Sequence, residues 1–152
     1  MTRVHSLERP EARLAWWLLL VGAALWCIAI VAAPVFGFES VYAFFSAICH
    51  QNPERTWFVG GSPLAVCVRC ASIYLGFLLA LTLRIPANYR FLKIALVATL
   101  VEFCCAMAGL DSEAVRSATG LALGLSAAGF VEAGSSELLL NRSGRFQERT
   151  GL

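Results

Sequence analysis

Charged residues are scarce in this 152-residue chain, because aspartate, glutamate, lysine and arginine make up only 14% of it. An average soluble domain carries roughly a quarter, and 59% of the residues here are hydrophobic. A globule of this length has too much surface for its volume to hide so much apolar material, which excludes a water-soluble fold. The chain has a small net charge of +2, and its basic residues are dispersed along the sequence. Both features argue against nucleic acid as a partner. The length allows one domain, residues 1–152.

Charge is missing altogether from residues 14–36. A helix needs roughly 20 apolar residues to cross the hydrocarbon core of a bilayer, so this run predicts a transmembrane span. A cleaved signal peptide has an apolar core of only about 7–15 residues, so this run is too long for one. Three further apolar stretches predict spans at about 63–84, 91–110 and 115–133. We therefore expect an all-α integral membrane protein, a bundle of four transmembrane helices.

The basic residues are distributed unevenly between the two sides of these spans. Nine lie in the tails or the second connection, and three lie near the first and third connections. The nine are Arg3, Arg9, Arg13, Arg84, Arg90, Lys93, Arg142, Arg145 and Arg149. Cytoplasmic connections carry the excess of lysine and arginine, so both termini are predicted to be cytoplasmic. The expected location is the inner membrane of a prokaryote, with the first connection (residues 37–62) facing outward.

That outward connection is predicted to hold one interfacial amphipathic helix. Four apolar side chains recur at helical spacing within about residues 40–50, and aromatic residues accompany them. The last turn of this helix carries Cys49. We expect the second span to begin at Pro63, because proline favours the first helical position. Cys67 and Cys70 then fall in its first two turns, at the outer edge of the membrane.

The pattern Cys49-His50 followed by Cys67-x-x-Cys70 predicts a metal site. Thiolate and imidazole ligands together suit zinc, copper or iron, and Cys-x-x-Cys is a common metal-binding spacing. We therefore expect Cys49, His50, Cys67 and Cys70 to be ligands, with zinc as the ion. Adjacent side chains diverge, so the alternative is that one of Cys49 and His50 supports the site without binding the ion. In this interpretation the metal holds the outer connection to the bundle.

Two other interpretations of the thiols stay open. A structural disulfide from Cys49 to Cys67 or Cys70 suits the oxidising outer face. Alternatively, Cys67 and Cys70, with Cys49 nearby, are catalytic, and the chain is similar to quinone-linked membrane enzymes that generate disulfides. Those enzymes pass electrons from a dithiol near the membrane surface to a quinone. Reactive cysteines usually lie at a helix N-terminus, whereas Cys67 is expected one turn inside its helix, which disfavours this alternative. Whether the chain is an enzyme is thus left open.

Glu102 is an ionisable residue within a predicted span. A carboxylate there costs on the order of 3 kcal/mol on insertion scales, so it normally faces the bundle interior and has a partner. Arg69 and Arg116 begin near the outer ends of other spans, and an ion pair with either would hold helices together. The functional alternative is a metal ligand or proton carrier below the cysteines, in a pocket shared with Cys105.

Small residues recur at Gly120-x-x-x-Gly124 in the fourth predicted span. This spacing lets two helices approach closely in lipid. We expect it to serve packing within the chain, with a homodimer through the same face as the alternative. The small size of the chain would also suit a peripheral subunit of a larger membrane complex.

Several motifs resemble a family of predicted membrane proteins, the domain of unknown function 2085. They are Cys49-His50-Gln51, Pro53-Glu54-Arg55, Cys67-Val68-Arg69-Cys70-x-x-Ile73-Tyr74-x-Gly76, and Arg116 with Thr119-Gly120-Leu121 and Gly124. The resemblance covers roughly residues 45–124, and Glu102 takes the place of an intramembrane aspartate of the family. Ala71-Ser72 departs from the family's small or hydroxyl residue followed by glycine.

The resemblance implies a shared four-span architecture and a common cysteine site, and it supplies no activity. Arg55, Arg69, Glu102 and Arg116 are expected to support that site. The favoured function is a non-catalytic accessory membrane protein with a structural zinc. The alternative is a quinone-linked thiol–disulfide oxidoreductase that uses Cys67, Cys70 and Cys49.

Overall fold

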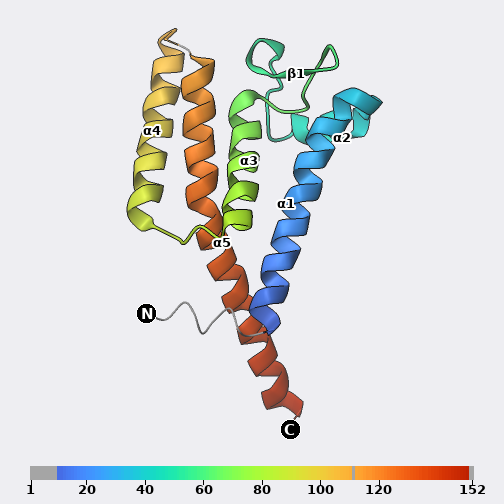
Figure 1. Ribbon diagram of the computed structural model, residues 1–152, viewed down its shortest axis with the longest axis vertical. Helices are drawn as coiled ribbons and strands as arrows, with labels where there is room; N and C mark the ends of the chain where they lie inside the picture. Colours follow the sequence, from blue (N-terminus) through green and yellow to red (C-terminus); the bar gives the residue numbers. More distant parts are fainter. Residues whose placement is uncertain (1–9, 111, 151–152) are drawn as a thin grey trace.

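The computed structural model describes residues 10–110 and 112–150, which form five α-helices, a short 3-10 helix and a small hairpin (Figure 1). The elements are α1 (Pro10–Phe36), α2 (Glu39–Ser46), η1 (Pro53–Arg55), β1 (Phe58–Val59), β2 (Ser62–Pro63), α3 (Val68–Leu83), α4 (Tyr89–Met107) and α5 (Glu113–Thr150). The prediction of an all-α chain is thus confirmed, apart from the four residues of the hairpin.

The four long helices form a bundle in which α5 is central. Helix α3 packs along α5, α4 packs against another side of α5, and α1 contacts both α3 and α5. The connection between α1 and α3 (residues 37–67) contains α2, η1 and the hairpin, and lies at the end of the bundle where α3 begins (Figure 1). The first turns of α1 and the last turns of α5 lie toward the opposite end.

Two helices in the described part of the chain are long and apolar enough to cross a membrane. These stretches are Ala12–Phe36, with a mean hydropathy of 2.5, and Glu113–Leu139, with 1.3. Helix α3 is apolar but has only 16 residues, about 24 Å at 1.5 Å per residue. Helix α4 carries three charged side chains, which lower its hydropathy. The count of four spans therefore rests on α3 and α4 and stays a prediction.

The second predicted span begins later than expected, at Val68 instead of residue 63. Gly60 and Gly61 adopt positive φ angles of 61° and 83°, which suit a two-residue hairpin turn. Ser62 and Pro63 consequently pair with β1 and do not begin a helix.

The other helix ends also differ from the sequence-based bounds. Helix α2 ends at Ser46, so Cys49 follows the helix and does not lie in its last turn. Helix α4 starts at Tyr89, because the side chain of Asn88 caps it by accepting from two backbone N–H groups. Helix α5 continues far beyond residue 133, to Thr150.

The Gly120/Gly124 face packs against α3 of the same chain. A Cβ atom added at Gly124 would lie 2.1 Å from the carbonyl oxygen of Ile73. One added at Gly76 would lie 2.4 Å from the carbonyl oxygen of Leu121. The backbones of α3 and α5 therefore touch each other. The Gly120/Gly124 face is thus used for packing within the chain, as expected from the sequence.

Gly124→Ala is expected to lower the free energy of unfolding by about 1–3 kcal/mol, because the two helices must move apart. Gly134→Ala is the matched control: its Cβ would meet nothing within 4 Å, and alanine is the better helix former by about 1 kcal/mol. Thermal unfolding in detergent, followed by circular dichroism, measures both. Equal unfolding midpoints for the two variants would contradict the close α3–α5 contact.

Candidate metal and thiol site

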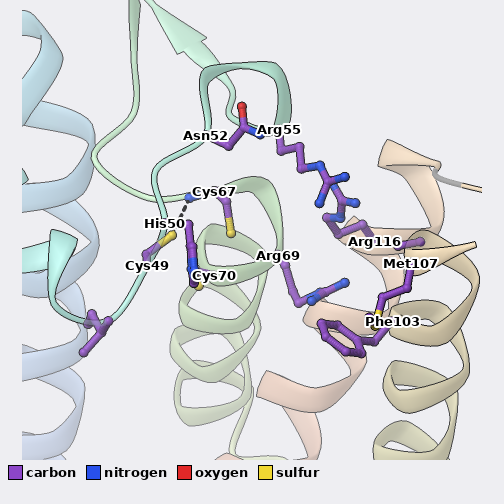
Figure 2. A pocket seen from close by; sticks show the side chains of 12 residues that line it. Cys49, His50, Asn52, Arg55, Cys67, Arg69, Cys70, Phe103, Met107 and Arg116 are labelled. Atoms are coloured by element: carbon purple, nitrogen blue, oxygen red, sulfur yellow. Dashed lines mark hydrogen bonds between the residues drawn. The ribbon is translucent and has the colours of Figure 1, made fainter. Parts of the chain in front are cut away.

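Three cysteines meet at the head of α3, and we call them the thiol cluster: Cys49, Cys67 and Cys70. Their sulfur atoms all lie within 4.8 Å of one another. The backbone N–H of Cys67 donates a hydrogen bond to Sγ of Cys49, at 3.2 Å (Figure 2). Cys67 and Cys70, which follow Cys49 by 18 and 21 positions in the sequence, thus meet it in one cluster.

The position of Cys49 is fixed by apolar packing and by one amide side chain. Cys49 is 6% exposed and belongs to a buried cluster with residues of α1, α2 and the segment after β2. The neighbouring Gln51, at a φ of 49°, donates from Nε2 to the carbonyls of Tyr42 and Ala65, both at 2.8 Å. Gln51 thus ties α2 to the segment that leads into α3. Sequence reasoning gave Gln51 no such role, although it lies inside the Cys-His-Gln motif.

Cys67 is the N-cap residue of α3 and precedes its first turn. The sequence-based objection to a reactive cysteine here was therefore wrong, because the later start of α3 moves Cys67 to the helix N-terminus. Hydrogen bonding to the Cys70 thiol, opposed by burial, lowers the pKa of Cys67 to about 5. Such a cysteine is a thiolate at neutral pH, the form that binds metals and attacks disulfides.

His50 lies beside the thiol cluster but outside it. Its side chain is exposed, it lines the same cavity as the three cysteines, and its ring nitrogens are not among the atoms within 4.8 Å of one another. Figure 2 shows His50 between the Cys49 and Cys67 segments. Its role as a ligand stays a prediction.

All six cysteines lie in the described part of the chain, and all six are free thiols. Three of them lie outside the cluster: Cys27, Cys104 and Cys105. Cys105 does not line the cavity beside the cluster, so the structure does not place it in a polar pocket with Glu102.

A cavity of about 720 Å³ opens beside the thiol cluster and extends to α4 and α5. Three arginines on three different elements line it: Arg55 from η1, Arg69 from α3 and Arg116 from α5 (Figure 2). The described residues of its wall are Ile48, Cys49, His50, Asn52, Arg55, Cys67, Arg69, Cys70, Phe103, Ala106, Met107 and Arg116.

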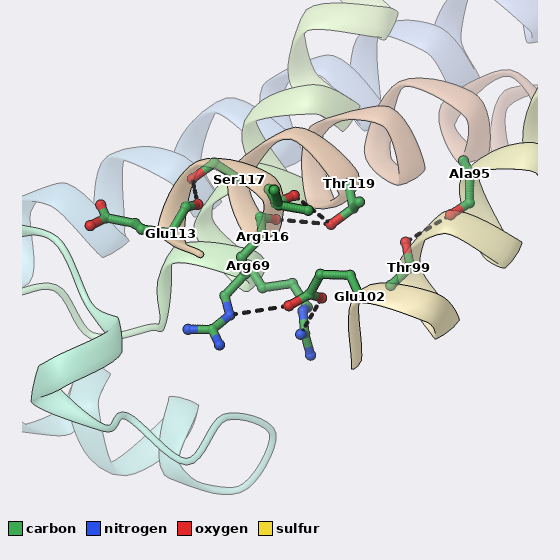
Figure 3. Close-up of polar contacts among 9 residues, drawn as sticks. Arg69, Ala95, Thr99, Glu102, Glu113, Arg116, Ser117 and Thr119 are labelled. Carbon is green, nitrogen blue, oxygen red and sulfur yellow. Dashed lines mark hydrogen bonds and ion pairs between the residues drawn. The ribbon is translucent and has the colours of Figure 1, made fainter. Parts of the chain in front are cut away.

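Glu102 lies between two of these arginines (Figure 3). Nη2 of Arg69 donates to Oε2 of Glu102, and Nε of Arg116 lies 3.6 Å from Oε1. Glu102 is 7% exposed and Arg116 is 4% exposed. One carboxylate from α4 thus joins α3 and α5 just below the cavity, which is the arrangement that the ion-pair interpretation of the sequence requires.

Comparison with known proteins places this chain in a family. Residues 49–130 match the model of a family described as predicted membrane protein, domain of unknown function 2085. An uncharacterized protein of Methanocaldococcus jannaschii is 30% identical over 115 residues, which cover 61% of this chain and 73% of that protein. An uncharacterized protein of Methanothermobacter thermautotrophicus is 32% identical over 90 residues, 53% of this chain and 81% of that protein.

No solved structure matches this chain. The family match begins at the first cysteine of the thiol cluster and includes all three arginines of the cavity and Glu102. The resemblance carried by the cysteine motifs is therefore confirmed, and the chain belongs to the family of predicted membrane proteins known as domain of unknown function 2085.

Proposed function

We propose that this membrane protein carries a structural zinc site on the outer face of a four-span bundle, and that it acts as a non-catalytic accessory subunit. The zinc fastens the α1–α3 connection to the head of α3. The observation that carries this proposal is the approach of three cysteine sulfur atoms to within 4.8 Å of one another.

The distances in the thiol cluster suit a tetrahedral zinc ion. Zinc–sulfur bonds of about 2.3 Å place two sulfur ligands about 3.8 Å apart at neighbouring corners of a tetrahedron. The observed sulfur atoms need to move only a little to reach that spacing. The N–H of Cys67 that donates to Cys49 would orient this sulfur and offset part of the negative charge of three thiolates.

A structural zinc site is closed by a fourth protein ligand. His50 follows Cys49 directly and lines the same cavity, so a side-chain rotation is the smallest change that would bring its ring to the cluster. The resulting Cys3His set is one of the common structural zinc sites.

The apolar surface of the bundle supports four spans. Large hydrophobic side chains of α4 are strongly exposed, including Val97 at 59% and Leu100 at 63%, and so is Leu25 of α1 at 61%. Lipid would cover this surface, and the charged Glu102 is turned inward to its arginines. The excess of basic residues in the tails and the second connection predicts that both termini are cytoplasmic. The thiol cluster, at the opposite end of the bundle, would then face outward in the inner membrane of a prokaryote.

The zinc content of the purified full-length protein tests the proposal. We expect about one zinc per chain, measured by plasma mass spectrometry after purification without added metal. Cys67→Ser is expected to lose at least nine tenths of it, because a structural site rarely survives with two thiolates. Cys105→Ser is the matched control and is expected to keep its zinc, since Cys105 lies outside the cluster.

The position of Cys67 favours a second candidate function, a quinone-linked thiol–disulfide oxidoreductase. Its thiol lies at a helix N-terminus with a lowered pKa, as in enzymes that cycle a Cys-x-x-Cys dithiol. Oxidation of Cys67 and Cys70 to a disulfide would release two electrons and two protons, which would reduce one quinone to a quinol. A metal-free protein whose Cys67–Cys70 dithiol is oxidised to a disulfide by added quinone, with formation of quinol, would establish this function and exclude zinc.

A further inference from the structure

The thiol cluster is divided between two segments of the α1–α3 connection, and the side chain of Gln51 joins them. Cys49 lies two residues before Gln51, and Cys67 lies two residues after Ala65, whose carbonyl accepts a hydrogen bond from Gln51. We propose that Gln51 is a positioning residue, which holds the two segments at the spacing that a metal requires before the metal binds. This inference rests on the proposed metal site, and its second test needs no metal.

The two hydrogen bonds of Gln51 use both N–H groups of its amide. Nε2 donates to the carbonyls of Tyr42 and Ala65, each at 2.8 Å. Both partners are backbone carbonyls, which only accept, so the nitrogen of the amide and not its oxygen must face them. An ionised glutamate has the same shape but no donor, and it cannot make either bond.

The backbone of Gln51 adopts a conformation that residues with a Cβ atom disfavour. Its φ angle of 49° lies in the left-handed region. Such a conformation persists only where the surrounding structure fixes it, and the two hydrogen bonds fix it here. The chain turns at this point, between the buried Cys49 and η1, and His50 lies at the turn beside the cavity.

A further hydrogen bond joins the same two segments. The hydroxyl of Tyr42 donates to the carbonyl of Pro63, so α2 is bound to β2 as well as to Ala65. None of these three bonds uses a sulfur atom. They bring the segments of Cys49 and Cys67 together without a metal, and ligands that are already in place bind a metal more tightly.

Metal affinity is the first test, with Co²⁺ as the probe. The full-length protein in detergent is stripped of metal, and Co²⁺ is titrated while the absorption band of the sulfur–cobalt bonds is recorded. Gln51→Glu is expected to weaken the binding of Co²⁺ by about 10–100-fold, the usual effect of losing a group that orients metal ligands. The band at saturation should be as intense as in the native protein, because all three thiolates remain.

Asn52→Asp is the matched control, since it makes the same change from amide to carboxylate at the next residue. Oδ1 of Asn52 accepts from the N–H of Glu54 at 3.0 Å, and a carboxylate oxygen can accept the same bond. This variant should bind Co²⁺ within about twofold of the native protein. Both variants should keep the unfolding midpoint of the metal-free protein, because the hydrogen bonds of both side chains lie within the connection.

Gln51→Gly separates the amide from the backbone conformation. Glycine suits a positive φ angle, so this variant removes both donors without adding strain or charge. It should also bind Co²⁺ more weakly, and it keeps the test valid if Gln51→Glu does not fold. Native affinity in Gln51→Gly, or equal weakening by Gln51→Glu and Asn52→Asp, would overturn the positioning role.

A measurement without metal separates this inference from the structural zinc. In a Cys70→Ser background, Cys49 and Cys67 are the remaining thiols of the cluster. Diamide, a thiol oxidant, takes two electrons and two protons from them as their disulfide forms, and is itself reduced to a hydrazine. The rate of this step, followed by mass spectrometry of the joined peptides, measures how often the two sulfur atoms meet.

Gln51→Gly is expected to slow the formation of the Cys49–Cys67 disulfide about tenfold, and Asn52→Asp should leave the rate unchanged. Equal rates in the Gln51→Gly variant and its background would refute the positioning role. A protein that binds no zinc but shows the slower rate in Gln51→Gly would refute only the structural zinc.

Discussion

Replacing Glu102 with glutamine is expected to cost about 3–5 kcal/mol of the free energy of unfolding. The substitution removes the carboxylate that Arg69 and Arg116 share, and water cannot readily replace that interaction because Glu102 is 7% exposed and Arg116 is 4% exposed. Breaking a buried ion pair by removing one partner typically carries a penalty of about this size. The measurement is chemical unfolding of the protein in detergent, followed by far-ultraviolet circular dichroism.

Two further variants show whether the loss comes from charge. Glu137→Gln removes a carboxylate from an exposed position on α5 and should change stability by less than about 0.5 kcal/mol. Glu102→Asp keeps the charge and should lose less than the glutamine variant.

A double-mutant cycle measures the interaction free energy between Glu102 and Arg69 directly. Once Glu102 is glutamine, the additional substitution Arg69→Gln should cost much less than it costs alone, because its partner has already gone. Additive losses, or a Glu102→Gln variant as stable as the native protein, would show that the buried ion pair does not hold α3, α4 and α5 together.

Removal of zinc is the second change with a large expected effect. Binding free energies of structural zinc are large, about 10–16 kcal/mol in small zinc domains, and here the ion would hold the α1–α3 connection. A chelator should therefore free that connection while the helices stay packed, because their contacts do not involve the metal.

The rate of trypsin cleavage after Arg55, an exposed residue of η1, measures how far the α1–α3 connection opens. We expect chelation to raise the rate of cleavage after Arg55 at least about tenfold, which corresponds to about 1.4 kcal/mol of lost local stability. Cleavage after Arg90, at the start of α4 at the other end of the bundle, provides the control within the same molecule and should not change. Equal rates at Arg55 with and without chelator would mean that no metal holds the connection.

The helices themselves were largely predictable from the sequence. Long apolar runs indicate α1 and α5 through hydropathy alone. The start of α3 was predicted wrongly, because Gly60-Gly61-Ser62-Pro63 fits both a helix start and a hairpin. Contacts distant in sequence favour the hairpin: the N–H of Leu64 donates to the carbonyl of Trp57 at 2.8 Å, and the hydroxyl of Tyr42 donates to the carbonyl of Pro63.

The site was predictable in its residue types but not in its shape. Cysteine spacing indicated that Cys67 and Cys70 act together, and their proximity to Cys49 followed from a short connection between helices. The cavity could not be foreseen, because Arg55, Arg69 and Arg116 come from three elements whose relative positions are set by tertiary packing. Gln51 was missed for the same reason, since both of its carbonyl partners are distant in the sequence.

X-ray absorption at the zinc edge of the full-length protein, as purified, tests the central claim most directly. The structural zinc predicts three sulfur ligands at about 2.3 Å and one nitrogen ligand at about 2.0–2.1 Å. Substitution of His50→Ala should remove the nitrogen shell and leave the three sulfur ligands in place. A protein without zinc, or with a zinc ion surrounded only by oxygen, would contradict the claim.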